Sequence, residues 1–163
     1  MRPLPKGLLA LGVAVVVIGC LALVGSSSRS AGATAAPDTA APGADTAAQS
    51  WQALKAHVGS SLPGLETDIG AVESAGQAGD TSGTTSAAET VKSDAANEVA
   101  WLQTNPAALC YQAVYDDYLS ANQTLETAMT DLINGEYAAA NALIAQFNSS
   151  IGTLANDTAT TAC

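Results

Sequence analysis

The side chains that could carry out chemistry are few in this chain, and histidine is the scarcest. His57 is the only histidine among 163 residues, and it lies beside an apolar stripe, where packing or exposure to solvent is the commoner role. A Ser-His-Asp triad would have to use His57, and no nucleophile-elbow sequence accompanies it. Di-iron bundles need Glu-x-x-His pairs and zinc sites need Cys/His sets, and the sequence contains neither. We therefore expect no metal, no cofactor and no enzymatic activity.

Paired carboxylates are the second candidate for chemistry. Glycoside hydrolysis needs two carboxyl groups in a cleft, one of them with a raised pKa. The closest pairs are Asp94 with Glu98 and Asp116 with Asp117, and the apolar pattern puts all four on the outer faces of predicted helices. The sequence thus predicts solvated surface carboxylates.

The three cysteines indicate a disulfide and an attachment site. Cys110 precedes and Cys163 follows a predicted helical hairpin whose turn lies near residue 135, so both are expected at one end of the hairpin. This spacing predicts a Cys110–Cys163 disulfide in an oxidising compartment, and two free thiols are the alternative. Closing a loop of about 54 residues would stabilise the fold by ~4 kcal/mol in the chain-entropy model. Cys20 is left without a partner and is a candidate lipidation site.

Aromatic side chains suggest a contact surface. Tyr111, Tyr115 and Tyr118 are spaced i, i+4, i+7 along a predicted helix, and Trp101 ends the helix before it. Tyrosine and tryptophan combine an apolar body with a polar tip and are enriched at interfaces. We expect these side chains to pack against the neighbouring helices, and a contact surface at this corner is the alternative.

Three regions position these residues: a signal sequence or membrane anchor (1–25), a flexible linker (26–44) and a helical domain (45–163). Arg2 and Lys6 precede nineteen uncharged residues, which is typical of an export signal. Three fates stay open. The run can remain as a membrane anchor, because nineteen helical residues span roughly 28 Å. It can be a lipoprotein signal, because residues 17–20 (VIGC) resemble the lipobox of bacterial lipoproteins, or it can be cleaved after small residues at 31–35.

The charge distribution restricts the partners. Beyond residue 30 the chain has two lysines and all fifteen of its acidic residues, which gives a net charge of −13. Nucleic-acid binding depends on cationic contacts with phosphates, so no nucleic-acid partner is expected. Every fate of the N-terminal segment places this acidic region outside the cytoplasm.

Apolar residues recur every three or four positions after residue 45, which predicts helices. Pro63-Gly64 interrupts the first stripe, so we expect one kinked helix or two in line, with Asp45 as N-cap. Ser86 and Glu89 form a capping box, which predicts the start of a second helix at Ser86. Asn105 and Pro106 are the predicted N-cap and first residue of a third helix, and Asn134-Gly135 is its predicted end. The expected inner residues are Trp51, Leu54, Val58, Leu62, Leu65, Ile69, Val72; Ala88, Val91, Ala95, Val99, Leu102; Cys110, Val114, Tyr118, Ala121, Leu125, Ala128, Leu132; and Tyr137, Ala140, Ile144, Phe147, Ile151, Leu154.

These stripes and the short connections predict an all-α, up-and-down antiparallel bundle of four helices, preceded by an apolar signal or anchor helix and a disordered linker. The expected function is a non-enzymatic binding or structural role at the cell envelope. The membrane is contacted through the N-terminal segment, and an envelope protein or a cell-wall component is the expected partner. The alternative is an extracytoplasmic protein that binds a small ligand or a cation, and secretion after signal cleavage is the alternative to anchoring.

Overall fold

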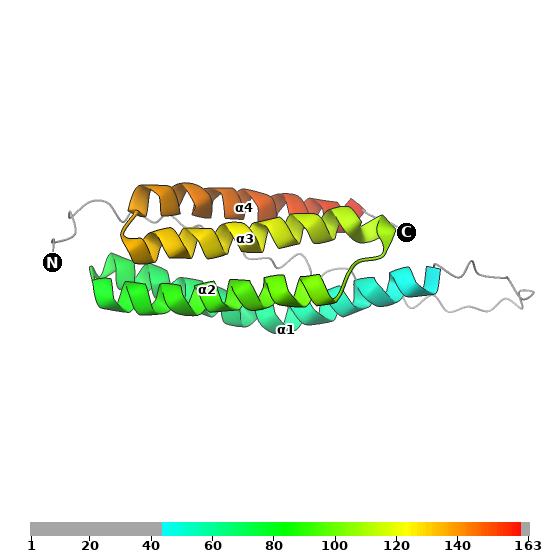
Figure 1. The fold of residues 1–163 in the computed structure, drawn as a ribbon, viewed down its shortest axis with the longest axis horizontal. Coiled ribbons are helices and arrows are strands. Elements are labelled where there is room, and N and C mark those ends of the chain that lie inside the picture. The colour runs from blue at the N-terminus through cyan, green and yellow to red at the C-terminus, as the bar shows by residue number, and fades with distance from the viewer. Residues whose placement is uncertain (1–43, 161–163) are drawn as a thin grey trace, which may run out of the picture.

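The computed structural model describes residues 44–160, in which all regular structure is helical. Four α-helices pack against one another, and a 3₁₀ helix, η2 (Leu109–Tyr111), precedes the third of them. They are α1 (Ala44–Gln77), α2 (Thr81–Thr104), α3 (Gln112–Asn134) and α4 (Tyr137–Thr160). Figure 1 shows each helix running back along the one before it. The prediction of an all-α fold with four packed helices is confirmed, whereas residues 1–43 lie outside the described region.

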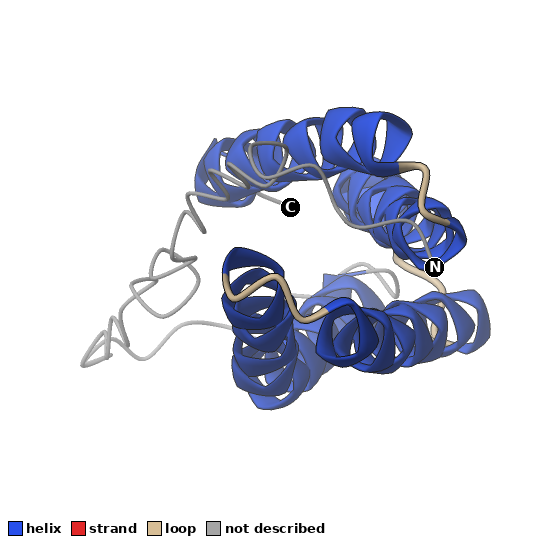
Figure 2. Ribbon diagram, turned by 90° about the vertical axis from the view of Figure 1, so that its left-hand side faces the viewer, coloured by secondary structure: helices blue, strands red, loops and turns tan. Residues whose placement is uncertain are grey.

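The core is built from residues three and four apart on each helix. Backbones approach most closely between successive helices, α1 with α2, α2 with α3, and α3 with α4, and Figure 2 shows the α1–α2 pair lying against the α3–α4 pair. The inner positions of α2 include Ala88, Val91 and Ala95, which have no exposed surface. Small side chains let helices approach closely, so α2 can pack between α1 and α3.

Helix α1 is continuous through Pro63, so of the two predicted arrangements the single helix is correct. Proline has no N–H, which leaves the carbonyl of Gly59 without its helical partner. Both residues are exposed, so water can replace this hydrogen bond. The predicted N-cap, Asp45, lies inside the helix because α1 begins at Ala44, and the bend expected at Pro63 stays a prediction.

Helix α2 begins earlier than predicted. Its N-cap is Asp80, whose Oδ1 accepts a hydrogen bond from the backbone N–H of Gly83 at 2.9 Å. Ser86, the predicted N-cap, lies in the helix and is exposed. The turn before α2 needs a left-handed residue, which Gly79 supplies with φ of 71°. Gly83 lies inside α2, so the turn before Ser86 is already helical and Asp80, not Ser86, is the residue at its start.

Replacing Asp80 by alanine should lower the free energy of unfolding by about 1 kcal/mol, since the N–H of Gly83 loses its acceptor. Ser86→Ala is the matched control and should change stability by less than about 0.5 kcal/mol. Urea denaturation followed by circular dichroism measures both. Equal losses in the two variants would contradict this assignment of the cap.

The connection between α2 and α3 also differs from the prediction. Asn105 is the C-cap of α2, and its Nδ2 donates to the carbonyl of Trp101 at 2.9 Å. Pro106 therefore lies in a connecting segment, and α3 starts six residues later, at Gln112. Asn105 thus donates to a carbonyl at the end of α2, whereas an N-cap would accept from the free N–H groups at the start of α3. The predicted stop at Asn134-Gly135 is confirmed: Gly135 caps α3 with φ of 80°.

Membrane attachment and the disulfide concern segments that the structure does not describe. Within residues 44–160 no helix combines the length and the apolar character needed to cross a membrane, and the predicted anchor (1–25) precedes them. Cys110 is exposed on η2 and is not a free thiol. Cys20 and Cys163 lie outside the described residues, so the Cys110–Cys163 pairing stays a prediction.

Candidate functional site

A buried carboxylate connects three helices near the middle of the bundle. Glu98 of α2 is only 5% exposed, and its Oε2 accepts a hydrogen bond of 2.9 Å from the hydroxyl of Tyr118 on α3. Both of its oxygens lie 3.1 Å from Nε2 of His57 on α1. Burying a carboxylate is costly unless donors surround it, and these two donors come from two other helices. We call His57, Glu98, Trp101, Tyr118 and Asn122 the Glu98 cluster.

The imidazole of His57 is held from two directions. Its ring stacks on Trp101 with centroids 3.9 Å apart and planes 3° from parallel, while Nε2 points to Glu98. Trp101 follows Glu98 by three residues, which places both on one face of α2. The side chain of His57 is 21% exposed, so the only histidine of the chain is packed at the edge of the core and already has its partners.

Tyr118 is the buried donor of the cluster. Burial, reinforced by the negative charge of Glu98, raises the pKa of the Tyr118 phenol far above its usual value. The phenol therefore stays protonated and donates to the carboxylate. One turn later, Nδ2 of Asn122 donates to the backbone carbonyl of Tyr118 at 2.9 Å, which fixes the amide beside the tyrosine.

Two oxygen atoms in this region are buried without a hydrogen-bond partner. They are Oδ1 of Asn122, a residue with 0% exposure, and Oγ of Ser61 on α1. Ser61 and Asn122 both adjoin the side chain of Tyr118 and slightly counteract the rise of its pKa.

A second acidic contact joins α1 to α2. Asp94 shares a hydrogen bond with Asp68 of α1, and burial, this hydrogen bond and the charges of Asp68 and Glu98 raise the pKa of Asp94. Five residues after Asp68, burial raises the pKa of Glu73, and its Oε1 has no partner. Asp68 and Glu73 of α1 and Asp94 of α2 are therefore three partly buried carboxyl groups.

A further aromatic group lies at the end of the bundle where α1 begins. Trp51 stacks on Tyr111 of η2 with ring centroids 4.7 Å apart, and the Lys55 amine lies 5.7 Å from the centre of the tryptophan ring. Ser50 accepts two hydrogen bonds: its Oγ from the N–H of Ala108, and its carbonyl from the hydroxyl of Tyr115. These contacts attach the first turns of α1 to the connection between α2 and α3.

The four residues predicted to form one contact surface are divided between these two groups. Trp101 and Tyr118 belong to the Glu98 cluster, whereas Tyr111 and Tyr115 pack near Trp51 and Ser50. The three tyrosines are buried, and Trp101 is half-buried. The contact role stays a prediction, and Trp101 is the member with the most surface left to serve it.

Comparisons with known proteins identify no relative. No family model, no curated protein and no solved structure matches the chain. Function must therefore be argued from these side chains alone.

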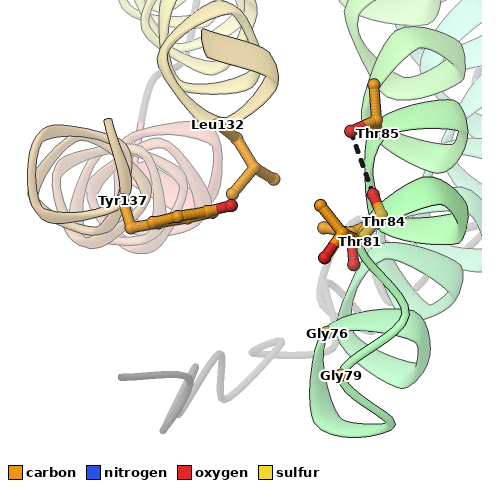
Figure 3. A pocket seen from close by; sticks show the side chains of 7 residues that line it. All are labelled: Gly76, Gly79, Thr81, Thr84, Thr85, Leu132 and Tyr137. Atoms are coloured by element: carbon orange, nitrogen blue, oxygen red, sulfur yellow. Dashed lines mark hydrogen bonds between the residues drawn. The ribbon is translucent and has the colours of Figure 1, made fainter. Parts of the chain in front are cut away.

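The opposite end of the bundle has a shallow hollow. It is lined by glycines and threonines at the end of α1, in the following turn and at the start of α2, across from Leu132 and Tyr137 (Figure 3). The full lining is Gly76, Gly79, Thr81, Thr84, Thr85, Leu132 and Tyr137. The lining therefore offers hydroxyl groups and no charged side chain. Across residues 44–160, no three His, Cys, Asp or Glu side chains converge as metal ligands.

The prediction that Asp94 and Glu98 are solvated surface carboxylates is wrong for Glu98, and Asp94 is only half-exposed, beside Asp68. Glu98 is buried in place of Val99, the predicted inner residue, which is half-buried. The alternating steps of four and three from Ala88 through Val91, Ala95 and Glu98 to Leu102 already mark position 98 as inner. The expectation for Asp116 and Asp117 is confirmed, since both are exposed.

Proposed function

We propose that this chain is a non-enzymatic helical-bundle protein of the cell envelope, exported and held at the membrane by residues 1–25. Residues 26–44 link this segment to an up-and-down antiparallel bundle closed by the Cys110–Cys163 disulfide. The bundle has a binding or structural role toward an envelope protein or a cell-wall component. Export follows from the basic and apolar N-terminal pattern.

The observation that carries the non-enzymatic role is the engagement of His57. General base catalysis needs a base that can reach a substrate proton, and Nε2 of this only histidine is bound to Glu98 while its face lies against Trp101. The carboxylate in turn is bound by Tyr118. His57, Glu98 and Tyr118 thus bind one another and connect three helices.

Cell fractionation tests the location. We expect the full chain in the membrane fraction and accessible to protease added outside the cytoplasmic membrane. A variant lacking residues 2–25 should stay in the cytoplasm. The intact mass of the chain with and without Cys20→Ser separates the two forms of attachment, because only a lipoprotein carries the mass of acyl groups at Cys20. Recovery of the full chain from the cytoplasm would contradict the proposal, and recovery from the medium would contradict anchoring.

Site-specific photo-cross-linking in the producing cell tests for a partner. A photoreactive amino acid at Trp101 should yield a discrete cross-linked product with one envelope component. The matched position is Thr90, which is exposed on the same helix but distant from the Glu98 cluster. The same products from both positions would show that Trp101 is not a contact residue.

Binding of a small cation is the second candidate function, supported by the unpaired oxygens of Ser61 and Asn122. We expect the melting temperature to be higher in sodium, potassium or ammonium chloride than in tetramethylammonium chloride at equal ionic strength. Asn122→Leu should remove this difference, since it deletes one of the two oxygens. Equal melting temperatures in all four salts would exclude this function.

A further inference from the structure

The two ends of the bundle differ in charge. The connection between α2 and α3 lies within residues 99–115, which contain no charged side chain. The turns at the opposite end carry Asp80 and Glu136, both exposed. Figure 1 shows the α2–α3 connection at the end of the bundle where α1 begins. The end with the uncharged connection is therefore the one that the preceding segment of the chain enters.

Leu109 projects from this connection. Among the described residues it is the large apolar side chain that stays exposed, at 94%. Single exposed apolar residues are common on protein surfaces, but the backbone on both sides of this one is held in place. Ala108 donates its N–H to Oγ of Ser50 at 3.2 Å, and Tyr111 stacks on Trp51 with ring centroids 4.7 Å apart. The leucine thus cannot fold back onto the core without breaking these contacts.

An aromatic ring and a cation lie close to Leu109 on α1. Trp51 is half-buried, and the amine of Lys55 lies 5.7 Å from the centre of its ring. Tryptophan is enriched at the level of lipid head groups, and lysine can extend its amine to water from the same level. We call Leu109, Trp51 and Lys55 the Leu109 tip. It combines an apolar point with two side chains suited to the surface of a membrane.

The predicted linker is shorter in reach than the bundle is long. As a flexible chain, residues 26–43 would reach roughly 20–25 Å. Helix α2, with 24 residues, is about 36 Å long. A tether of this reach keeps the beginning of α1 closer to the membrane than the opposite end of the bundle. It also raises the effective concentration of the tip at the lipid surface, so that a weak contact becomes populated.

We propose that the Leu109 tip rests on the lipid surface, with Leu109 inserted among the acyl chains and the side chains of Trp51 and Lys55 at the level of the head groups. The contact rests on the proposed function, because residues 1–25 must first hold the chain at the membrane. It adds an orientation to that function: the turns after α1 and α3 point away from the membrane, toward other envelope components.

The lipid that suits this contact is neutral overall. Asp45 in the first turn of α1 and Asp157 in the last turn of α4 lie at the same end of the bundle. Anionic head groups repel carboxylates. Zwitterionic phosphatidylcholine is therefore the lipid for the test.

Quenching of tryptophan emission by brominated acyl chains tests the contact, because bromine quenches an indole ring that lies against it. The full chain carries Leu109→Trp in a background of Trp51→Phe and Trp101→Phe and is reconstituted into phosphatidylcholine vesicles. The matched control is Ala78→Trp in the same background, since Ala78 is exposed in the turn at the opposite end. We expect brominated lipid to lower the emission from position 109 and to leave that from position 78 unchanged.

Flotation of the vesicles in a density gradient reports on the anchor separately. Chains that float but show no quenching at position 109, or equal quenching at both positions, overturn the contact and leave the anchor standing. Chains that do not float contradict the anchor, and the contact falls with it. No quenching in vesicles, together with a cross-link from position 109 to a protein in the producing cell, would assign the tip to a protein partner instead.

A second set of variants keeps Trp51 as the reporter in a Trp101→Phe background. Brominated lipid should lower the emission of Trp51. Leu109→Asp should remove most of this loss, because inserting a carboxylate into hydrocarbon is costly, whereas Leu109→Ile should retain it. An equal loss of emission in Leu109→Asp and in the chain with leucine would show that Leu109 is not inserted.

Discussion

Leu125→Ala is expected to lower the free energy of unfolding by about 2–5 kcal/mol. Leu125 is 2% exposed and lies in the middle of α3, the helix that packs against both α2 and α4. Truncation removes apolar contacts and leaves a cavity, because helices on both sides limit how far the site can collapse. Chemical denaturation of the purified chain, followed by circular dichroism, measures the loss as a shift of the midpoint at unchanged slope.

Leu109 offers a matched control for this change. The same residue type is 94% exposed on η2, so Leu109→Ala removes no buried surface and should change stability by less than about 0.5 kcal/mol. Similar losses at the two positions would contradict the packing described for α3.

Glu98→Ala is expected to lower the free energy of unfolding by about 1–3 kcal/mol. The change leaves the buried hydroxyl of Tyr118 without an acceptor and His57 without its carboxylate partner. An unsatisfied buried polar group costs more than the original hydrogen bond contributes. Thermal and urea unfolding at pH 7 measure this loss.

A double variant with apolar residues at Glu98 and Tyr118 tests whether the loss comes from the unpaired hydroxyl of Tyr118. Glu98→Leu with Tyr118→Phe removes the carboxylate and its buried hydroxyl donor together, so it should recover the part of the loss that comes from the unpaired hydroxyl. His57 still loses its partner, but its side chain is 21% exposed and can bind water. The matched control is Glu89→Ala on the same helix, which is exposed and should be nearly neutral. If the double variant is as unstable as Glu98→Ala, then packing rather than hydrogen bonding explains the cost.

The helices themselves could be predicted because their evidence is local. Apolar residues at steps of three and four indicate which face turns inward, and almost all predicted inner residues of α3 and α4 are buried; Cys110 is exposed and Tyr137 half-buried. Gly135 could be recognised as a stop because a left-handed residue after a helix favours glycine. Each of these inferences needs only a few neighbouring residues.

Helix ends were predicted less well because several residues can serve as caps. Asp80 and Ser86 both suit the N-cap of α2, and Asn105 suits either the end of one helix or the start of the next. The outcome depends on where the chain must turn to bring α1 back against α2 and α2 against α3. That decision is made by packing between helices.

The sequence by itself determined the four helices, their order and their apolar faces, because helix periodicity and turn residues act over one or two turns of chain. Only the tertiary structure decided that His57, Glu98 and Tyr118 meet, since they come from α1, α2 and α3. It also decided which neighbours the tyrosines meet: Tyr111 stacks on Trp51, and Tyr118 donates to Glu98. The physical reason is that the partners of a buried polar group are chosen by helix register across the bundle, and register depends on contacts between residues distant in the chain.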